Sequence, residues 1–229
     1  MSFLEFEKKI GIKFNNVDLL KQAFTHRSYL NENPKWDVEH NERLEFLGDA
    51  VLELIVTEFL YKKFPDKNEG EMTSFRAALV NTNTLAELAE DLSMDTFLLL
   101  SKGEKKGPAR ARLSLLANSV EAVIGAVYLD QDYGVARKFL KENLFPKLDK
   151  VIEEKLWIDS KSLFQEKAQD VESITPSYKV IEEHGPDHEK HFVVGVYLGE
   201  ELVAQGDGLS KQDAEQEAAR SGLKVKKWN

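Results

Sequence analysis

The stretch that decides the fold spans residues 41–54 and reads NERLEFLGDAVLEL. Its apolar residues recur at spacings of three and four, which is the period of one buried helical face. They are Leu44, Leu47, Val51, Leu54 and Ile55. The pattern predicts a long amphipathic helix at about residues 39–64. We expect it to end before Pro65, because proline lacks the backbone donor that a helix needs.

The same helix carries three acids, Glu42, Glu45 and Asp49, on another face. Like charges four residues apart repel, so Glu45 and Asp49 destabilise the isolated helix. Gly48 lies between them and costs about 1 kcal/mol relative to alanine inside a helix. Carboxylates held beside a residue without a side chain suggest a bound cation and a closely approaching ligand or backbone. From these residues alone, a solvated acidic face explains the pattern equally well.

Length and composition allow one large or two small domains. Hydrophobic residues make up 42% of the 229 positions, which is enough for a packed core. Cysteine is absent, which excludes disulfides and thiolate metal sites and suits a reducing cytoplasm. The acidic N-terminus is unlike a signal peptide, and the apolar run at residues 122–129 is too short to span a bilayer. We therefore expect a cytoplasmic protein without membrane association.

The net charge of −9 argues against a general nucleic-acid binder, which usually has a basic surface. Residues 160–229 contain 9 Lys/Arg and 13 Asp/Glu, and the remainder of the chain contains 22 and 27. Neither part is basic overall. Any contact with nucleic acid must therefore use local patches, or bound cations that offset the acids.

The periodicity divides the chain into two regions. The first contains only helical patterns, and the second contains three alternating runs typical of strands, between two helices. We expect a multidomain protein with an all-α domain at residues 1–155 and a small α+β (α-β-β-β-α) domain at residues 160–229. Besides the long helix, the expected helices are residues 3–10, 17–24, 71–80, 84–91, 113–130, 134–151 (interrupted near Pro146), 161–170 and 210–224, and the strands are 177–183, 191–198 and 201–205.

A second helix, at residues 113–130, combines a strongly apolar composition with Asn118 and Glu121, three positions apart. A carboxylate on so apolar a helix needs a partner, because burying it unpaired is costly. With the acids of the first helix and with Glu69 in the loop before residue 71, it makes a set of oxygen ligands without histidine or cysteine. Such ligands suit Mg²⁺ or Mn²⁺ rather than zinc.

Two polar segments have more than one interpretation. His26 and Arg27 precede the long helix in a region expected to be a helix end and a loop. They are either functional residues or a hydrogen-bonded structural pair, and we favour the structural pair. Residues 102–112 (KGEKKGPARAR) form a predicted basic loop. It is either a flexible solvated segment or a contact for phosphates, and spacing does not distinguish the two.

Residues 40–54 (HNERLEFLGDAVLEL) resemble the signature of the ribonuclease III family. The flanking stretches AFTHRSYLNE, FPDKNEGEMTSFRAALVNTNTLAELA and LLANSVEAVIGAVYLDQDYG agree with it, and the C-terminal module resembles a double-stranded RNA-binding domain. The resemblance implies an endoribonuclease that hydrolyses double-stranded RNA to 5′-phosphate and 3′-hydroxyl ends. It also implies Mg²⁺, for which Mn²⁺ substitutes, and a homodimer that processes ribosomal RNA precursors and structured messages.

The resemblance also assigns roles to residues. Glu45, Asp49 and Glu121 would be metal ligands, Asp49 and Glu121 with catalytic duties, and Glu42 and Glu69 auxiliary catalytic acids. Phe46 would dock into the partner subunit. One position departs from the family, which commonly has an ADxxEA pattern where this chain reads ANSVEA. Asn118 can ligate a metal through its carbonyl oxygen but brings no charge, so we expect it to remain a metal-site residue with weaker Mg²⁺ affinity.

In the small domain, the resemblance implies three RNA-binding surfaces: a helix face, a loop between strands, and the start of the last helix. Their residues are Gln165, Glu166 and Gln169, then His188, then Ser210 and Lys211. The last surface departs from the family, since Gln212 and Asp213 follow Lys211 where a second basic residue is typical. We therefore expect weak, salt-sensitive RNA binding by this domain alone.

Two alternatives belong to other classes. A non-cleaving, double-stranded RNA-binding regulator that keeps the fold would account for Asn118 and the reduced basic cluster. A helical metal-dependent phosphohydrolase acting on small molecules would account for the acids, but not for the appended module.

Overall fold

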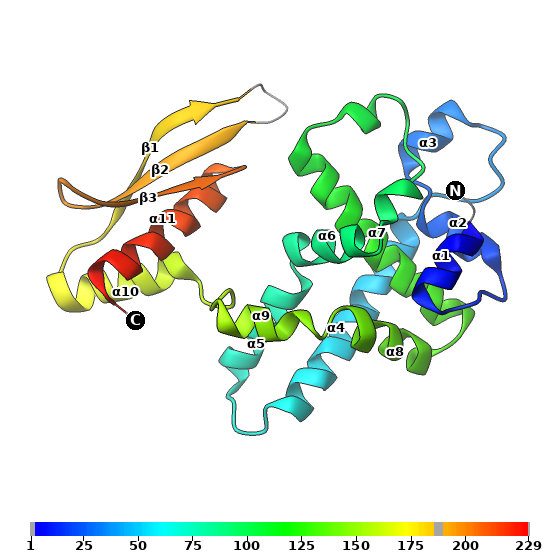
Figure 1. The fold of residues 1–229 in the computed structure, drawn as a ribbon, viewed down its shortest axis with the longest axis horizontal. Helices are drawn as coiled ribbons and strands as arrows, with labels where there is room; N and C mark the ends of the chain where they lie inside the picture. The colour runs from blue at the N-terminus through cyan, green and yellow to red at the C-terminus, as the bar shows by residue number, and fades with distance from the viewer. Residues whose placement is uncertain (1–2, 186–189, 229) are drawn as a thin grey trace. The chain divides into compact units, whose positions relative to one another are not determined.

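The computed structural model describes residues 3–185 and 190–228. The chain divides into two compact units (Figure 1). The larger comprises residues 1–107 and 111–157, and the smaller comprises residues 158–229 together with 108–110. Each unit has its own hydrophobic core.

The larger unit is helical, as the periodicity predicts. Two short 3₁₀ turns, η1 (Met94–Thr96) and η2 (Glu104–Lys106), join the later helices. The helices are α1 (Phe3–Ile10), α2 (Val17–Ala23), α3 (Arg27–Glu32), α4 (Glu42–Lys63), α5 (Glu69–Val80), α6 (Thr82–Asp91), α7 (Ala109–Asp130), α8 (Tyr133–Asn143) and α9 (Lys147–Glu153).

Side-chain caps set several helix starts. Asn16 accepts a hydrogen bond from the backbone N–H of Asp18 and caps α2. Asn68 and Glu71 form a reciprocal capping box at α5. This box draws Glu69 into the first turn, so the prediction that Glu69 lies in a loop is wrong.

Two further expectations about loops are also wrong. Residues 27–32 form α3, whose N-cap is His26. α7 begins at Ala109, so Arg110 and Arg112 belong to a helix and the basic loop is shorter than its composition suggests. Helix period does not reveal either segment, because α3 is short and mostly polar and the start of α7 follows a Gly-Pro pair.

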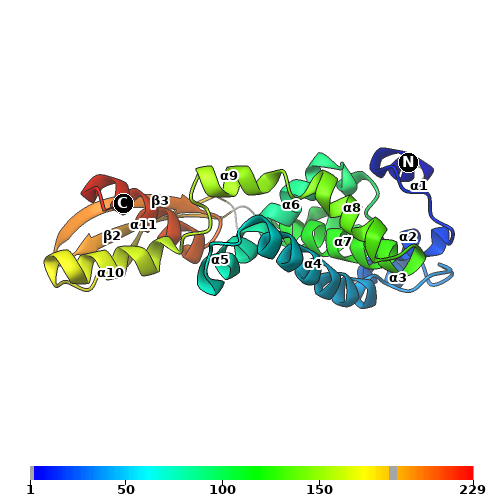
Figure 2. The same cartoon turned by 90° about the horizontal axis from the view of Figure 1, so that it is seen from below.

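α7 runs through the middle of the helical unit, and Figure 2 shows α4 along its lower edge. Leu44, Val51 and Ile55 of α4 are buried, and α7 has ten buried residues. Leu54 is 59% exposed, so its assignment to the buried face is wrong. α7 is long and apolar enough to cross a membrane by length and composition, and 56% of its apolar window is buried inside the protein. Its apolarity therefore matches a core helix.

The smaller unit contains α10 (Ser160–Glu172), an antiparallel sheet and α11 (Lys211–Lys226). The strands β1 (Ser177–His184), β2 (His191–Leu198) and β3 (Glu201–Gly208) pair in sequence order. Gly206 has no room for a side chain, because a Cβ would lie 2.1 Å from the backbone nitrogen of Ala218. This close approach places α11 directly on β3. The order of the elements along the chain confirms the predicted α-β-β-β-α arrangement.

Candidate active site

Four of the predicted metal-site residues come from the two central helices. α4 presents Glu45 and Asp49, one turn apart, and α7 presents Asn118 and Glu121 in the same way. A Cβ on Gly48 would lie only 1.7 Å from the carbonyl oxygen of Glu121. The helices therefore touch through their backbones at Gly48, and this contact brings the acids of α4 beside Glu121.

The contact is reciprocal. A Cβ on Gly125 would lie 2.3 Å from the carbonyl oxygen of Leu44. The sequence suggested that either a ligand or a backbone approaches Gly48 closely. The structure shows that it is the backbone of α7.

The carboxylates of α4 and α7 influence one another electrostatically. Burial, together with the negative charges of Asp49 and Glu45, raises the pKa of Glu121 to about 7. Burial also raises the pKa of Glu45, and Glu42 and Asp49 add to the increase. A hydrogen bond from Asn118 opposes that shift by stabilising the charged form of Glu45. These carboxylates therefore have unsatisfied negative charge.

A pocket of about 180 Å³ opens beside Glu45. Asn41 also lines it, which sequence reasoning did not identify. Asn41 is 3% exposed, and among the described residues its side-chain oxygen has no hydrogen-bond partner. Nothing in the helical period marks this residue, because it precedes the first turn of α4. The lining residues are His26, Asn41, Glu42, Glu45, Leu98, Leu115 and Asn118.

His26 and Arg27 do not bond each other, so their interpretation as a hydrogen-bonded pair is wrong. His26 Nδ1 lies 2.8 Å from Ser28 Oγ, within the cap of α3. Arg27 instead pairs with Glu42 at 3.5 Å. This ion pair partly neutralises Glu42 at the rim of the pocket. Burial lowers the pKa of His26.

Glu69 occupies a different place. It is exposed in the first turn of α5 and lines a second pocket with Tyr61 and Met72. A single chain therefore does not place it in the pocket that holds Glu45 and Asn118.

The donors fit a hard divalent cation. Within residues 3–185 and 190–228, Glu45, Asp49 and Glu121 form no ion pair with a lysine or arginine, so their charge is open to a metal. The three do not form a set whose donor oxygens all lie within 4.8 Å of one another. Mg²⁺ tolerates such a spread because it usually keeps several waters and binds through only one or two carboxylates.

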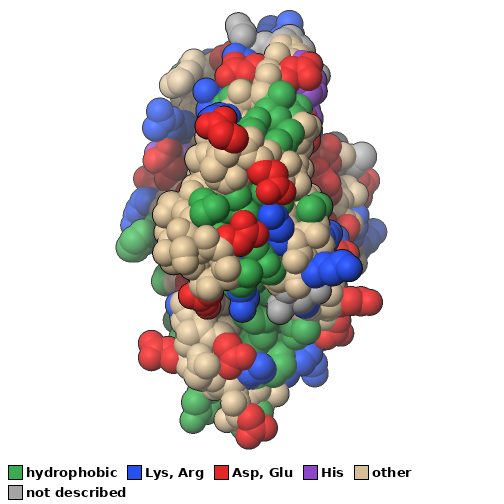
Figure 3. All heavy atoms as spheres, turned by 90° about the vertical axis from the view of Figure 1, so that its left-hand side faces the viewer, with side chains coloured by type: hydrophobic (Ala, Val, Ile, Leu, Met, Phe, Trp, Pro, Cys, Tyr) green, Lys and Arg blue, Asp and Glu red, His purple; other side chains and the backbone are tan. Residues whose placement is uncertain are grey.

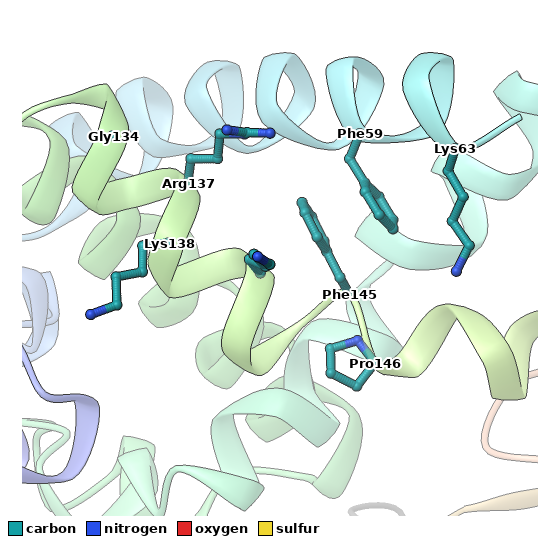
Figure 4. A pocket seen from close by; sticks show the side chains of 8 residues that line it. Phe59, Lys63, Gly134, Arg137, Lys138, Phe145 and Pro146 are labelled. Carbon is teal, nitrogen blue, oxygen red and sulfur yellow. The ribbon is translucent and has the colours of Figure 1, made fainter. Parts of the chain in front are cut away.

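Figure 4 shows another pocket, between α4, α8 and the segment before α9. Phe59 and Phe145 stack there with ring centroids 3.7 Å apart. The charged residues that line this pocket are all cations, so its chemistry differs from that of the carboxylates on α4 and α7. The cations are Lys63, Arg137, Lys138 and Lys141.

Phe46 is 82% exposed. Leu54 and Tyr61 continue from it along α4 at 59% and 71% exposure. The spacings of eight and seven residues place all three on one side of the helix. These three side chains form an apolar stripe on α4 that the described part of the chain leaves exposed.

The predicted RNA-binding residues of the smaller unit differ in their exposure and in the partners that they already have within the chain. Gln165, Glu166 and Gln169 are exposed together on α10. Ser210 caps α11: its hydroxyl accepts from the backbone N–H of Asp213 at 3.2 Å and donates to that side chain at 2.6 Å. Lys211 pairs with Glu183 at 3.3 Å.

His188 lies outside the described residues. Acidic and basic side chains are interspersed over the face shown in Figure 3, in agreement with the mixed composition of the sequence.

Comparison with known proteins agrees with this geometry. Residues 16–148 match the Ribonuclease-III-like family, and residues 160–226 match the double-stranded RNA binding motif. "Ribonuclease 3" of Enterococcus faecalis is 46% identical over 96% of this chain and 95% of its own length. "Ribonuclease 3" of Carboxydothermus hydrogenoformans is 45% identical over 99% and 96%.

A crystal structure of the nuclease domain of ribonuclease III from Campylobacter jejuni superposes with a TM-score of 0.57 at 36% identity, covering 63% of this chain and 99% of that domain. A two-helix carboxylate site followed by a double-stranded RNA-binding module defines a class of metal-dependent nucleases. The chain belongs to the ribonuclease III family. It is an endoribonuclease of double-stranded RNA that requires a divalent metal.

Proposed function

We propose that Glu45, Asp49 and Glu121 hold Mg²⁺, with Mn²⁺ as a substitute, and that Asn118 completes the site. The observation that carries this proposal is the set of carboxylates that α4 and α7 bring together, for which the described residues supply no lysine or arginine partner. A bound Mg²⁺ supplies Lewis-acid stabilisation of the charge that develops on a phosphodiester. The products are 5′-phosphate and 3′-hydroxyl ends.

The protein side chains have distinct duties in this proposal. Asp49 is exposed and Glu121 is half-buried. Asn118 holds Glu45 through its hydrogen bond. Glu42 and Glu69 act as auxiliary acids, Glu42 from the rim of the pocket and Glu69 from α5.

Incubation with long duplex RNA tests this function. We expect cleavage with Mg²⁺ or Mn²⁺ and none with EDTA, with a phosphate on the 5′ end of each product. Binding without cleavage in all metals would contradict the proposal and favour the non-cleaving regulator.

Asn118→Asp is expected to lower the Mg²⁺ concentration needed for half-maximal cleavage by about three- to tenfold. The added charge lies next to Glu45 and strengthens attraction for a cation by roughly 1 kcal/mol. A Mg²⁺ titration of the cleavage rate measures the effect. Asn143→Asp, on α8 and away from the carboxylates, is the matched control, and an unchanged metal requirement in Asn118→Asp would show that the residue is not part of the site.

We propose that the exposed stripe of α4 is the interface of a homodimer. A pocket beside Phe46 has mixed polar and apolar walls, and its apolar part, which includes Leu19, Leu47 and Leu129, suits an aromatic ring from a second copy. The Campylobacter jejuni structure concerns a region involved in dimer formation of its own nuclease domain.

Phe46→Asp is expected to shift the protein from dimer to monomer, with at least a tenfold rise in the dissociation constant. A charge at a buried aromatic contact removes apolar burial and adds a desolvation cost. Light scattering after size-exclusion chromatography measures the mass. Val171→Asp, at an exposed apolar residue of α10, should leave the mass unchanged, and a dimeric Phe46→Asp would place the interface elsewhere.

We propose that the exposed face of α10, the loop containing His188 and the start of α11 bind the duplex. Ribosomal RNA precursors and structured messages in the cytoplasm are the proposed substrates. Free N–H groups at a helix start attract phosphate. Here the Asp213 carboxylate occupies that end and Glu183 partly neutralises Lys211, which favours weak binding.

Asp213→Asn is expected to strengthen duplex binding about three- to tenfold at low salt, with the gain fading as salt rises. The substitution removes a negative charge from the end of α11, where phosphate would approach. Fluorescence anisotropy of the full chain with a labelled duplex, in EDTA to prevent cleavage, measures it. Glu200→Gln, in the β2–β3 turn, removes a negative charge at another place and is the control. An equal gain in duplex affinity for Glu200→Gln would show that the effect of Asp213→Asn comes only from the change in net charge.

A further inference from the structure

A pair of histidines flanks the connection at residues 185–190. β1 ends at His184 and β2 begins at His191. His184 and His191 are cross-strand partners, so their side chains lie on the same face of the sheet. Their rings stack with centroids 5.5 Å apart and an angle of 17° between planes. The pairing holds two imidazoles side by side at the last rung of the β1–β2 ladder.

β3 adds a carboxylate to this pair. Asp207 lies opposite Val193, which is two residues from His191 on the same face. His191 Nδ1 lies 3.0 Å from Asp207 Oδ1. One donor atom from each of His184, His191 and Asp207 lies within 4.8 Å of the other two, and no other three such residues in the described parts of the chain meet this condition.

The face that carries this trio is opposite the helices. Val194 and Val196, on the alternate face of β2, are buried, and Val196 lies in the core with α10 and α11. His184 and Asp207 are exposed and His191 is half-buried. The donors therefore have room to rotate onto an ion, and solvent has access to a further coordination position.

The donor chemistry selects a class of ion. Two imidazoles and one carboxylate are the ligands of borderline transition metals, whereas Mg²⁺ and Ca²⁺ prefer oxygen. Three protein ligands with a fourth position open to water match a zinc coordination sphere. The Asp207 carboxylate accepts a hydrogen bond from His191 when Nδ1 carries the ring proton, and this contact orients the ring.

We propose that His184, His191 and Asp207 form a second metal site, for Zn²⁺ or a similar transition metal, in the small unit. The site is separate from the carboxylates of α4 and α7 and does not depend on their role. A bound ion joins all three strands at one end of the sheet and ties together the two residues from which the connection containing His188 departs.

Zn²⁺ titration of the full chain by calorimetry, with Mg²⁺ in excess to occupy the carboxylates, tests the site. The wild-type protein is expected to bind one Zn²⁺ per chain in this event. His184→Gln and His191→Gln, on different strands, are each expected to weaken it at least tenfold. Glu200→Gln, which removes a carboxylate from the other end of the β2–β3 pair, should bind as the wild type does.

Co²⁺ supplies a second readout, because its visible absorption reports nitrogen ligation. The wild-type protein and Glu200→Gln should give the same band, and both histidine variants should lose it. Equal Zn²⁺ affinity in wild type and histidine variants would overturn the proposal and leave His191 and Asp207 as a simple ion pair. A loss in all variants, Glu200→Gln included, would also overturn it, since the binding would then follow surface charge.

Discussion

Glu121→Gln is expected to abolish cleavage of duplex RNA and, at the same time, to stabilise the metal-free protein above neutral pH. Glutamine keeps the size of the side chain but removes the charge that attracts the cation. The loss of a metal-binding carboxylate should lower the single-turnover cleavage rate by at least about 10²-fold at saturating duplex. Because α4 is untouched, Glu45 and Asp49 remain in place.

The stability gain follows from the raised pKa of Glu121, about 7 in the folded protein against an ordinary value of 4.5. Between these values the folded state binds more protons than the unfolded state, so stability falls as pH rises through this window. Above about pH 7 the charged carboxylate imposes its full penalty, of roughly 1–3 kcal/mol. Glutamine never ionises and escapes this penalty.

Urea unfolding in EDTA at about pH 5 and about pH 8 separates the effects. The variant should exceed the wild type in stability at the higher pH and differ little at the lower one. Glu142→Gln, at an exposed carboxylate of α8, is the control and should change neither cleavage nor the pH dependence. Cleavage near the wild-type rate by Glu121→Gln would remove this residue from the metal site.

Gly48→Ala is expected to destabilise the helical unit by about 3 kcal/mol or more, because overpacking against a rigid backbone cannot be relieved by a side-chain rotation. The added Cβ would lie 1.7 Å from the Glu121 carbonyl oxygen, so α4 and α7 must separate. That separation also moves Glu45 and Asp49 away from Glu121. Cleavage in any folded fraction should fall about 10²-fold, since catalytic geometry tolerates little displacement.

Thermal unfolding and cleavage assays of the same samples measure both effects. Gly125→Ala should behave similarly, because its Cβ would lie 2.3 Å from the Leu44 carbonyl oxygen. Gly103→Ala is the matched control: its backbone is helical in φ and ψ, and the nearest atom is 3.9 Å from the new Cβ. A stable and active Gly48→Ala would show that the two helices do not depend on this close contact.

Much of the fold follows from local patterns. The three- and four-residue spacing in 41–54 predicts α4, and alternation predicts the three strands, because each pattern reflects one face that must be buried. Asn16 and Ser210 mark helix starts because their side chains replace the missing backbone partners of the first turn. α3 escapes prediction because six mostly polar residues carry too little period to distinguish a helix from a loop.

The sequence by itself also placed the carboxylates Glu45, Asp49 and Glu121 on helices with strong apolar faces. Its resemblance to a known family implied that an RNA-binding module would follow. Only the tertiary structure decided how the carboxylates meet. Gly48 marks a backbone contact with α7 that no local pattern specifies, since its partner lies over seventy positions away. The same applies to His184, His191 and Asp207, which strand register brings together. Local period reports which face of an element is buried, whereas the pairing of faces is settled by packing across the whole chain.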